Sequence, residues 1–141
     1  MTQIETRARK RQISEMLAIA AMILLLVHLA DGSMERFIHH GFLPANINKR
    51  PFGLSNVGIS SIILFLLAFG IDRREKYKSN LTTTLLIVGG ALIGTSALGV
   101  TVMDRGERMA ATLVVSLIGY LIMGLGILRA IQQSRISSNI V

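Results

Sequence analysis

Long apolar stretches alternate along this chain with short segments that hold its charged residues. Residues 16–30, 54–71, 81–103 and 109–128 contain no Asp, Glu, Lys or Arg, and the first stretch can be extended upstream to residue 13. A helix rises about 1.5 Å per residue, so roughly 20 apolar residues cross a hydrocarbon core about 30 Å thick. The pattern therefore predicts an all-α integral membrane protein. Its four transmembrane helices, at about 13–30, 54–71, 81–103 and 109–128, should form an antiparallel up-down bundle.

Composition supports this class and excludes several others. Of the 141 residues, 51% are hydrophobic and 16% are charged, whereas soluble domains carry about a quarter charged residues. The chain has no cysteine, which excludes a disulfide framework, a zinc ribbon and thiol-based redox chemistry. We expect residues 1–141 to form a single membrane domain, with residues 31–53 as its main external loop.

The first apolar stretch follows a basic segment, so it resembles both a cleavable signal peptide and a retained membrane anchor. Cleavage after Ala30 would require a small residue two positions upstream, and that position holds His28. The sequence therefore favours a first span that stays in the membrane.

The basic residues predict the orientation of the spans. Ten of the fifteen Lys and Arg residues precede the first span, separate the second from the third, or follow the fourth. The positive-inside rule then places both termini in the cytoplasm. We expect the protein in the plasma membrane of a prokaryote or in an organelle membrane.

The net charge of +7 would suggest nucleic acid binding in a soluble protein. Here the basic residues flank membrane spans, where attraction to anionic lipid, at about 1 kcal/mol per basic residue, accounts for them. We therefore expect the lipid bilayer and other integral membrane subunits as partners, and no nucleic acid.

Small residues recur along the third and fourth spans at the spacing of one helix face. Such residues let transmembrane helices approach closely. The linker 104–108 is short, so the two spans should form a helical hairpin. The faces suit either packing within the chain or docking onto another membrane protein. The candidate docking residues are Gly90, Ala91, Gly94, Thr95, Gly99, Ser116, Gly119 and Gly126.

A possible metal site follows the first span. If the first helix continues past residue 30, then His28, Asp31, Glu35 and His39 lie on one face, three or four residues apart. Two imidazoles and two carboxylates could bind a divalent metal such as zinc, copper or iron, or relay protons. No other cofactor is predicted.

The alternative is a helix break at Asp31 and Gly32. Ser33 would then cap a short helix along the membrane surface, with the loop histidines as ordinary interfacial residues. Gly32 and Ser33 favour this alternative, because both residue types are common at helix ends.

The sequence contains no motif of a self-sufficient enzyme, such as a phosphate-binding glycine loop, H-E-x-x-H or a serine elbow. No catalytic residue is predicted. The first hypothesis is a non-catalytic accessory subunit of a larger membrane complex of a respiratory, photosynthetic or membrane-monooxygenase type. The alternatives are a small homo-oligomeric transporter or channel, with Glu15 as its acidic group, and a membrane metal-binding protein that uses the His28–His40 region.

Overall fold

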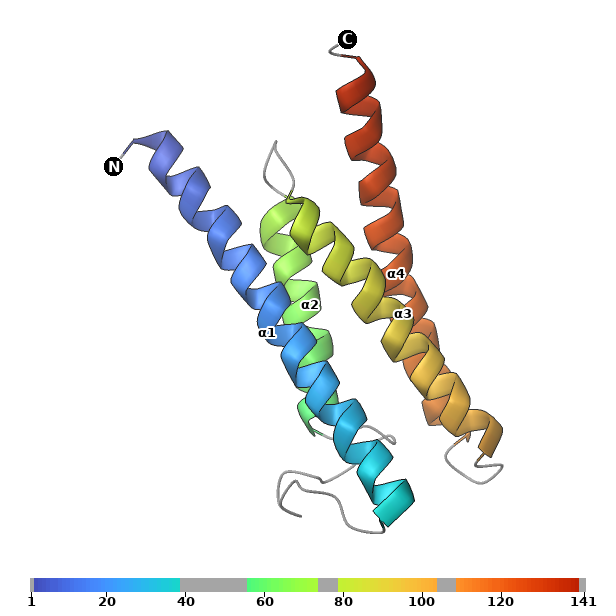
Figure 1. Ribbon diagram of the computed structural model, residues 1–141. Coiled ribbons are helices and arrows are strands. Elements are labelled where there is room, and N and C mark those ends of the chain that lie inside the picture. Colours follow the sequence, from blue (N-terminus) through green and yellow to red (C-terminus); the bar gives the residue numbers. More distant parts are fainter. Residues whose placement is uncertain (1, 39–55, 74–78, 104–108, 140–141) are drawn as a thin grey trace.

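The computed structural model describes residues 2–38, 56–73, 79–103 and 109–139 (Figure 1). These residues form four helices and no strand, and each helix is long and apolar enough to cross a membrane. The predicted four-span, all-α membrane fold is therefore confirmed. The helices are α1 (Gln3–Ile38), α2 (Asn56–Arg73), α3 (Asn80–Met103) and α4 (Met109–Ser138).

The helices alternate in direction, as the up-down prediction requires. α1 begins, α2 ends, α3 begins and α4 ends at one end of the bundle, which we call the terminal end (Figure 1). The opposite end, where α1 ends and α2 begins, is called the loop end.

Two helices are longer than the apolar stretches that predict them. α1 begins at Gln3 and α4 continues to Ser138, so each adds about ten residues, or roughly 15 Å, at the terminal end. These extensions are rich in Arg, Lys, Gln, Ala and Glu, all good helix formers. Hydropathy marks where a helix leaves the apolar core, whereas helix propensity decides where it stops.

α1 is continuous through Asp31 and Gly32 and reaches Ile38. The hydroxyl of Ser33 donates a hydrogen bond to the carbonyl oxygen of Leu29, at 2.8 Å, a bond typical of a helix interior. The helix break that Gly32 and Ser33 were expected to favour is therefore wrong: α1 is continuous here, and Ser33 does not begin a separate surface helix.

The four helices form two hairpins. α3 packs along α4, and α1 packs along α2; α1 also contacts α3, and α2 contacts α3 over a shorter stretch. The hairpin predicted for the third and fourth spans is present. Contact between the two hairpins runs mainly through α1 and α3.

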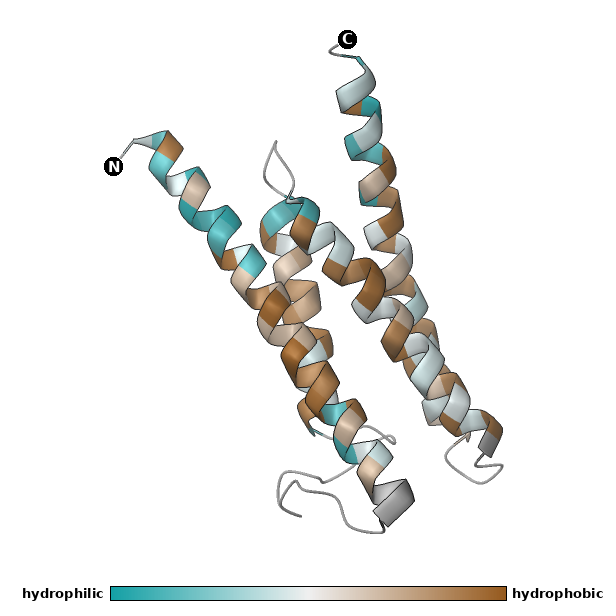
Figure 2. Ribbon diagram, viewed as in Figure 1, coloured by the Kyte–Doolittle hydropathy of each residue, from teal (hydrophilic) through white to brown (hydrophobic). Residues whose placement is uncertain are grey.

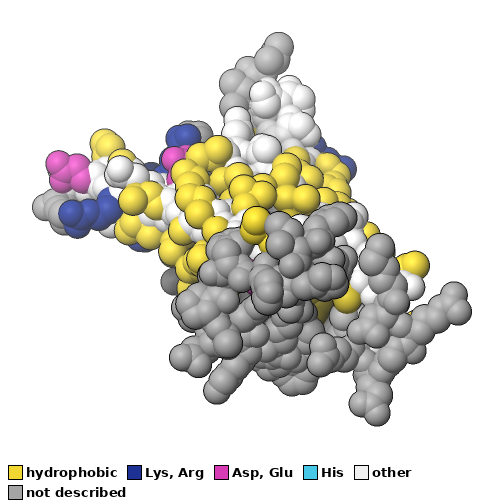
Figure 3. Space-filling model, turned by 60° about the horizontal axis from the view of Figure 1, so that its bottom comes forward, with side chains coloured by type: hydrophobic (Ala, Val, Ile, Leu, Met, Phe, Trp, Pro, Cys, Tyr) yellow, Lys and Arg dark blue, Asp and Glu magenta, His cyan; other side chains and the backbone are white. Residues whose placement is uncertain are grey.

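The outer surface is apolar, and much of the interior is small or polar. Ile23, Leu67, Val102 and Leu117 are each more than half exposed, whereas Ser61 is fully buried. Hydrophobic residues follow the middle of every helix in Figure 2 and cover much of the face in Figure 3 that the grey atoms leave visible. Soluble proteins rarely expose apolar surface on this scale. The same surface is expected of helices that face lipid.

Candidate functional site at the terminal end

Glycines bring α3 and α4 into close contact. A Cβ atom added to Gly90 would lie 2.4 Å from the backbone nitrogen of Met123, and one added to Gly119 would lie 2.4 Å from the backbone nitrogen of Gly94. The hydroxyl of Ser116 donates to the carbonyl oxygen of Gly94, at 3.1 Å. These predicted docking residues therefore pack against each other within the chain.

The other predicted docking residues divide between two faces. Gly126 is buried in the same seam, where an added Cβ would lie 2.7 Å from Cγ1 of Ile87. Thr95 and Gly99 are exposed, and Ala91 is partly buried. A Cβ added to Gly99 would meet nothing within 4 Å. Ala91, Thr95 and Gly99, which we call the α3 outer ridge, therefore lie away from the seam that α4 fills.

A second glycine contact joins the two hairpins. The ring of Phe65 on α2 occupies the space beside Gly89 on α3, where an added Cβ would lie 2.3 Å from the ring. Phe65 is fully buried and belongs to the hydrophobic core with Leu25, Leu86 and Ile122. Sequence analysis did not single out Gly89, because its role depends on an aromatic residue of another helix.

Hydroxyl groups at depth donate across helix interfaces. Ser61 on α2 donates to the carbonyl oxygen of Ala21 on α1, and Ser14 on α1 donates to the carbonyl oxygen of Ala68 on α2, both at 3.0 Å. Near the loop end, the hydroxyl of Thr101 on α3 donates to the hydroxyl of Thr112 on α4, at 2.8 Å. Such bonds average about 0.6 kcal/mol in membranes, so they orient helices more than they hold them.

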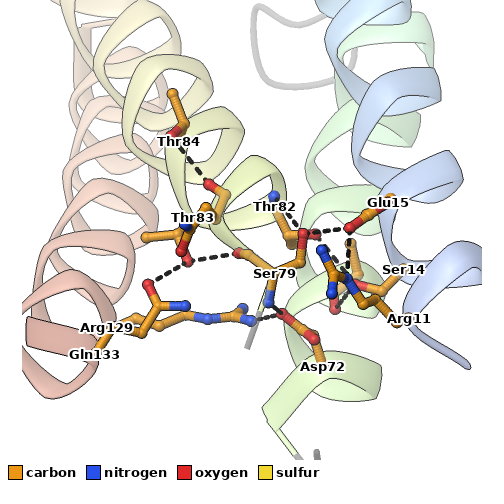
Figure 4. Close-up of polar contacts among 12 residues, drawn as sticks. Arg11, Ser14, Glu15, Asp72, Ser79, Thr82, Thr83, Thr84, Arg129 and Gln133 are labelled. Carbon is orange, nitrogen blue, oxygen red and sulfur yellow. Dashed lines mark hydrogen bonds and ion pairs between the residues drawn. The ribbon is translucent and has the colours of Figure 1, made fainter. Parts of the chain in front are cut away.

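A polar cluster at the terminal end draws residues from all four helices, and Ser79 lies at its centre (Figure 4). Ser79 precedes α3 and caps it, because its hydroxyl accepts a hydrogen bond from the backbone N–H of Thr82, at 3.4 Å. The same hydroxyl donates to Glu15 on α1, at 2.6 Å, and the backbone N–H of Ser79 donates to Asp72 on α2, at 3.4 Å. One capping residue therefore binds two carboxylates.

An arginine accompanies each of these carboxylates. Arg11 on α1 donates to Glu15, at 3.0 Å, and is largely exposed. Arg129 on α4 forms an ion pair with Asp72, and the two side chains are 3% and 0% exposed. Within the described part of the chain, Oδ1 of Asp72 and Nε and Nη1 of Arg129 have no hydrogen-bond partner.

The geometry explains why two acids gather here. The N-terminus of a helix carries partial positive charge, which favours carboxylates beside it, and both acids lie at the N-terminus of α3. Thr83 on α3 also bonds to Gln133 on α4, at 3.5 Å. The cluster can tie the four helices together where the chain leaves the apolar core, and its carboxylates are groups that could accept a proton.

The predicted metal ligands lie at the other end of α1. Asp31 is 1% exposed and His28 is partly buried. The side chain of Glu35 and all of His39 lie outside the described residues. Among the residues described, no three His, Cys, Asp or Glu side chains are grouped closely enough to hold a metal ion. Because half of the proposed ligand set is not described, the metal site remains a prediction.

Sequence analysis missed most of the polar cluster. It named Glu15 as the acidic group of a possible transporter, but it gave no role to Asp72 and counted Arg129 only among the basic residues that follow the fourth span. Both residues stand one position beyond an apolar stretch, which was a usable signal. Their pairing could not be predicted from the sequence, because it depends on how two separate hairpins meet.

The fold and these contacts define a multi-pass membrane protein made of two helical hairpins joined by a polar cluster. Comparison of the chain with protein-family models, with curated proteins and with solved structures finds no match. Its function is therefore inferred from its own residues.

Proposed function

We propose that the protein is a non-catalytic accessory subunit of a larger integral membrane complex of a respiratory, photosynthetic or membrane-monooxygenase type. The observation that carries this proposal is the α3 outer ridge, a small-residue face that α4 leaves uncovered on an apolar outer surface. Only 22–33% of the most apolar window of each helix is buried within the chain. Two hairpins that share a narrow contact leave long helix faces available to helices of other subunits.

The α3 outer ridge is the part of this surface best suited to helix docking. A glycine in a helix is less favourable than alanine by about 1 kcal/mol, and contact with lipid does not compensate for this cost. Contact with a neighbouring helix does compensate for it, because small residues let that helix approach closely. The ridge residues Thr95 and Gly99 are exposed, so a partner helix can reach them without displacing α4.

Isolation from native membranes in mild detergent tests the proposal. We expect a complex containing the chain and at least one other membrane protein in fixed stoichiometry. Gly99→Leu should remove that partner, because a bulky side chain blocks the ridge. Gly124→Leu is the matched control, since an added Cβ at Gly124 also meets nothing within 4 Å. Recovery of the wild-type chain alone, as a monomer of 15.4 kDa, would exclude an accessory role.

The polar cluster favours a second candidate, a small homo-oligomeric transporter or channel. Ionisable residues within or beside membrane spans often mark ion or proton pathways, and the acids Glu15 and Asp72 share one capping serine. For this candidate we expect Glu15→Gln to abolish proton-coupled uptake into vesicles, with the exposed Glu5→Gln as control. Unchanged uptake in Glu15→Gln would remove this candidate.

We also propose that the terminal end faces the cytoplasm, as the positive-inside rule predicts. The absence of cysteine makes the test simple, because one introduced cysteine is the only thiol to label. Thr2→Cys should react with a membrane-impermeant maleimide in inverted plasma-membrane vesicles or on intact organelles, and it should stay unlabelled in intact cells. The reverse pattern would invert the topology.

A further inference from the structure

A basic stripe on the extension of α1 continues the face by which α1 packs into the bundle. Positions three or four residues apart share one face of a helix. Towards the loop end this face is buried, and towards the N-terminus it is basic and exposed. Along the stripe from the N-terminus lie Arg7, Lys10, Arg11, Ser14, Ala18, Ala21 and Leu25.

The stripe changes from buried to exposed where α2 and α3, the two helices that contact α1, terminate. α2 ends at Arg73 and α3 begins at Asn80, whereas α1 starts about 15 Å before the predicted first span. Residues 2–13 are accordingly exposed, and Figure 1 shows the first turns of α1 projecting away from the other helices. The inward face of α1 therefore continues beyond the described helices that cover it.

Charge indicates what this exposed face would bind. Arg7 has like-charged neighbours three and four residues on, at Lys10 and Arg11, an arrangement that destabilises a helix. Arg11 is paired with Glu15 and Lys10 also has a partner within the chain, whereas Arg7 has no ion-pair partner in the described part of the chain. A carboxylate-rich surface against this face would offset the repulsion.

We propose that the Arg7 face of α1 docks an acidic extramembrane segment of a partner subunit. This inference rests on the proposed accessory role and identifies the chemistry of the partner. Anionic lipid headgroups can bind basic residues on the outward side of the helix, whereas the Arg7 side continues the face by which α1 packs into the bundle. Arg9 lies on the outward side, about 200° around the helix from Arg7. The two arginines are both exposed, so they form a matched pair for a test.

Photo-cross-linking of the full chain in native membranes separates the two faces. Benzoylphenylalanine is placed at position 7 or at position 9, and the adducts are identified by mass spectrometry. We expect position 7 to yield a peptide rich in Asp and Glu at least fivefold more efficiently than position 9. We also expect Arg7→Glu to remove that subunit from the isolated complex, while Arg9→Glu retains it.

The same chain, reconstituted alone in phosphatidylglycerol vesicles, provides the lipid control. Lipid adducts at both positions in native membranes, at the level seen in these vesicles, would identify a lipid-binding surface and overturn the proposal. So would equal loss of the partner in the Arg7→Glu and Arg9→Glu variants. If a partner copurifies but position 7 does not reach it, the acidic docking site fails and the accessory role stands. If the chain is isolated alone, both fail.

Discussion

Asp72 and Arg129 form a buried ion pair that joins α2 to α4, two helices with little other contact. Each residue belongs to a different hairpin, so the pair spans the contact between the two halves of the molecule. Its position beside the capping residue Ser79 places it at the N-terminus of α3, where the helix dipole stabilises the carboxylate. The pair therefore helps to fix how the hairpins meet at the terminal end.

Removing either member of this pair should destabilise the protein more than removing both. Asp72→Asn and Arg129→Met each leave an uncompensated buried charge, which costs about 3–5 kcal/mol in free energy of unfolding. The double variant leaves no charge, so its loss should be smaller than that of either single variant. Reversible unfolding in mixed detergent micelles measures all three values.

Arg73→Met is the control for this cycle, because it removes a neighbouring but exposed charge and should change stability by less than about 0.5 kcal/mol. Additive losses from the two single variants would show that Asp72 and Arg129 do not act as a pair.

The close approach of α3 and α4 predicts a large difference between glycines of similar sequence context. Gly90→Ala should destabilise the hairpin by about 1–3 kcal/mol, because the new methyl group meets backbone atoms of α4 that cannot move aside. Gly99→Ala should be neutral or stabilising by up to about 1 kcal/mol, since it meets nothing and improves helix propensity. Energy transfer between dyes on α3 and α4 during unfolding reports both effects.

If Gly99→Ala destabilised the isolated chain more than Gly90→Ala does, this would contradict the close packing of α3 against α4 at Gly90. Gly99→Ala studied in native membranes reports on the α3 outer ridge instead, so the isolated chain is the appropriate sample.

Sequence reasoning located the fold well because the dominant signal is local. Charge-free stretches of sufficient length predict spans without any knowledge of neighbours, and the short linker 104–108 predicted the hairpin of α3 and α4. The ends of the helices were harder to predict from the sequence. α1 and α4 continue through polar residues that favour helix, so the apolar windows were shorter than the helices.

The candidate site was less predictable because its members are distant in sequence. Nothing local to Asp72 indicates Arg129, and nothing local to Ser79 indicates Glu15. Each contact depends on the crossing of two hairpins. The same limit applied to Gly89, whose partner Phe65 lies on another helix.

Phe65 and Gly89 should behave as a coupled pair. Gly89→Ala should destabilise the protein by about 1–3 kcal/mol, because the added methyl group overlaps a fully buried ring. In a Phe65→Leu background the ring is absent, so the same substitution should cost less. A double-mutant cycle from unfolding in detergent gives the coupling energy. Equal effects of Gly89→Ala in both backgrounds would show that the ring does not set the spacing of α2 and α3.

Ser79→Ala should be the most damaging of the single hydroxyl removals. It deletes the cap of α3, worth about 0.5–2 kcal/mol, and leaves Glu15 without its 2.6 Å donor, which adds about 1–3 kcal/mol for a bond to a charged group. Ser60→Ala is the matched control, because the exposed Ser60 hydroxyl donates only to the carbonyl oxygen of Asn56 in its own helix. We expect Ser60→Ala to change stability by less than about 0.5 kcal/mol. Similar losses from the two substitutions would mean that Ser79 is an ordinary helix residue and that the terminal cluster is held by the Asp72–Arg129 pair alone.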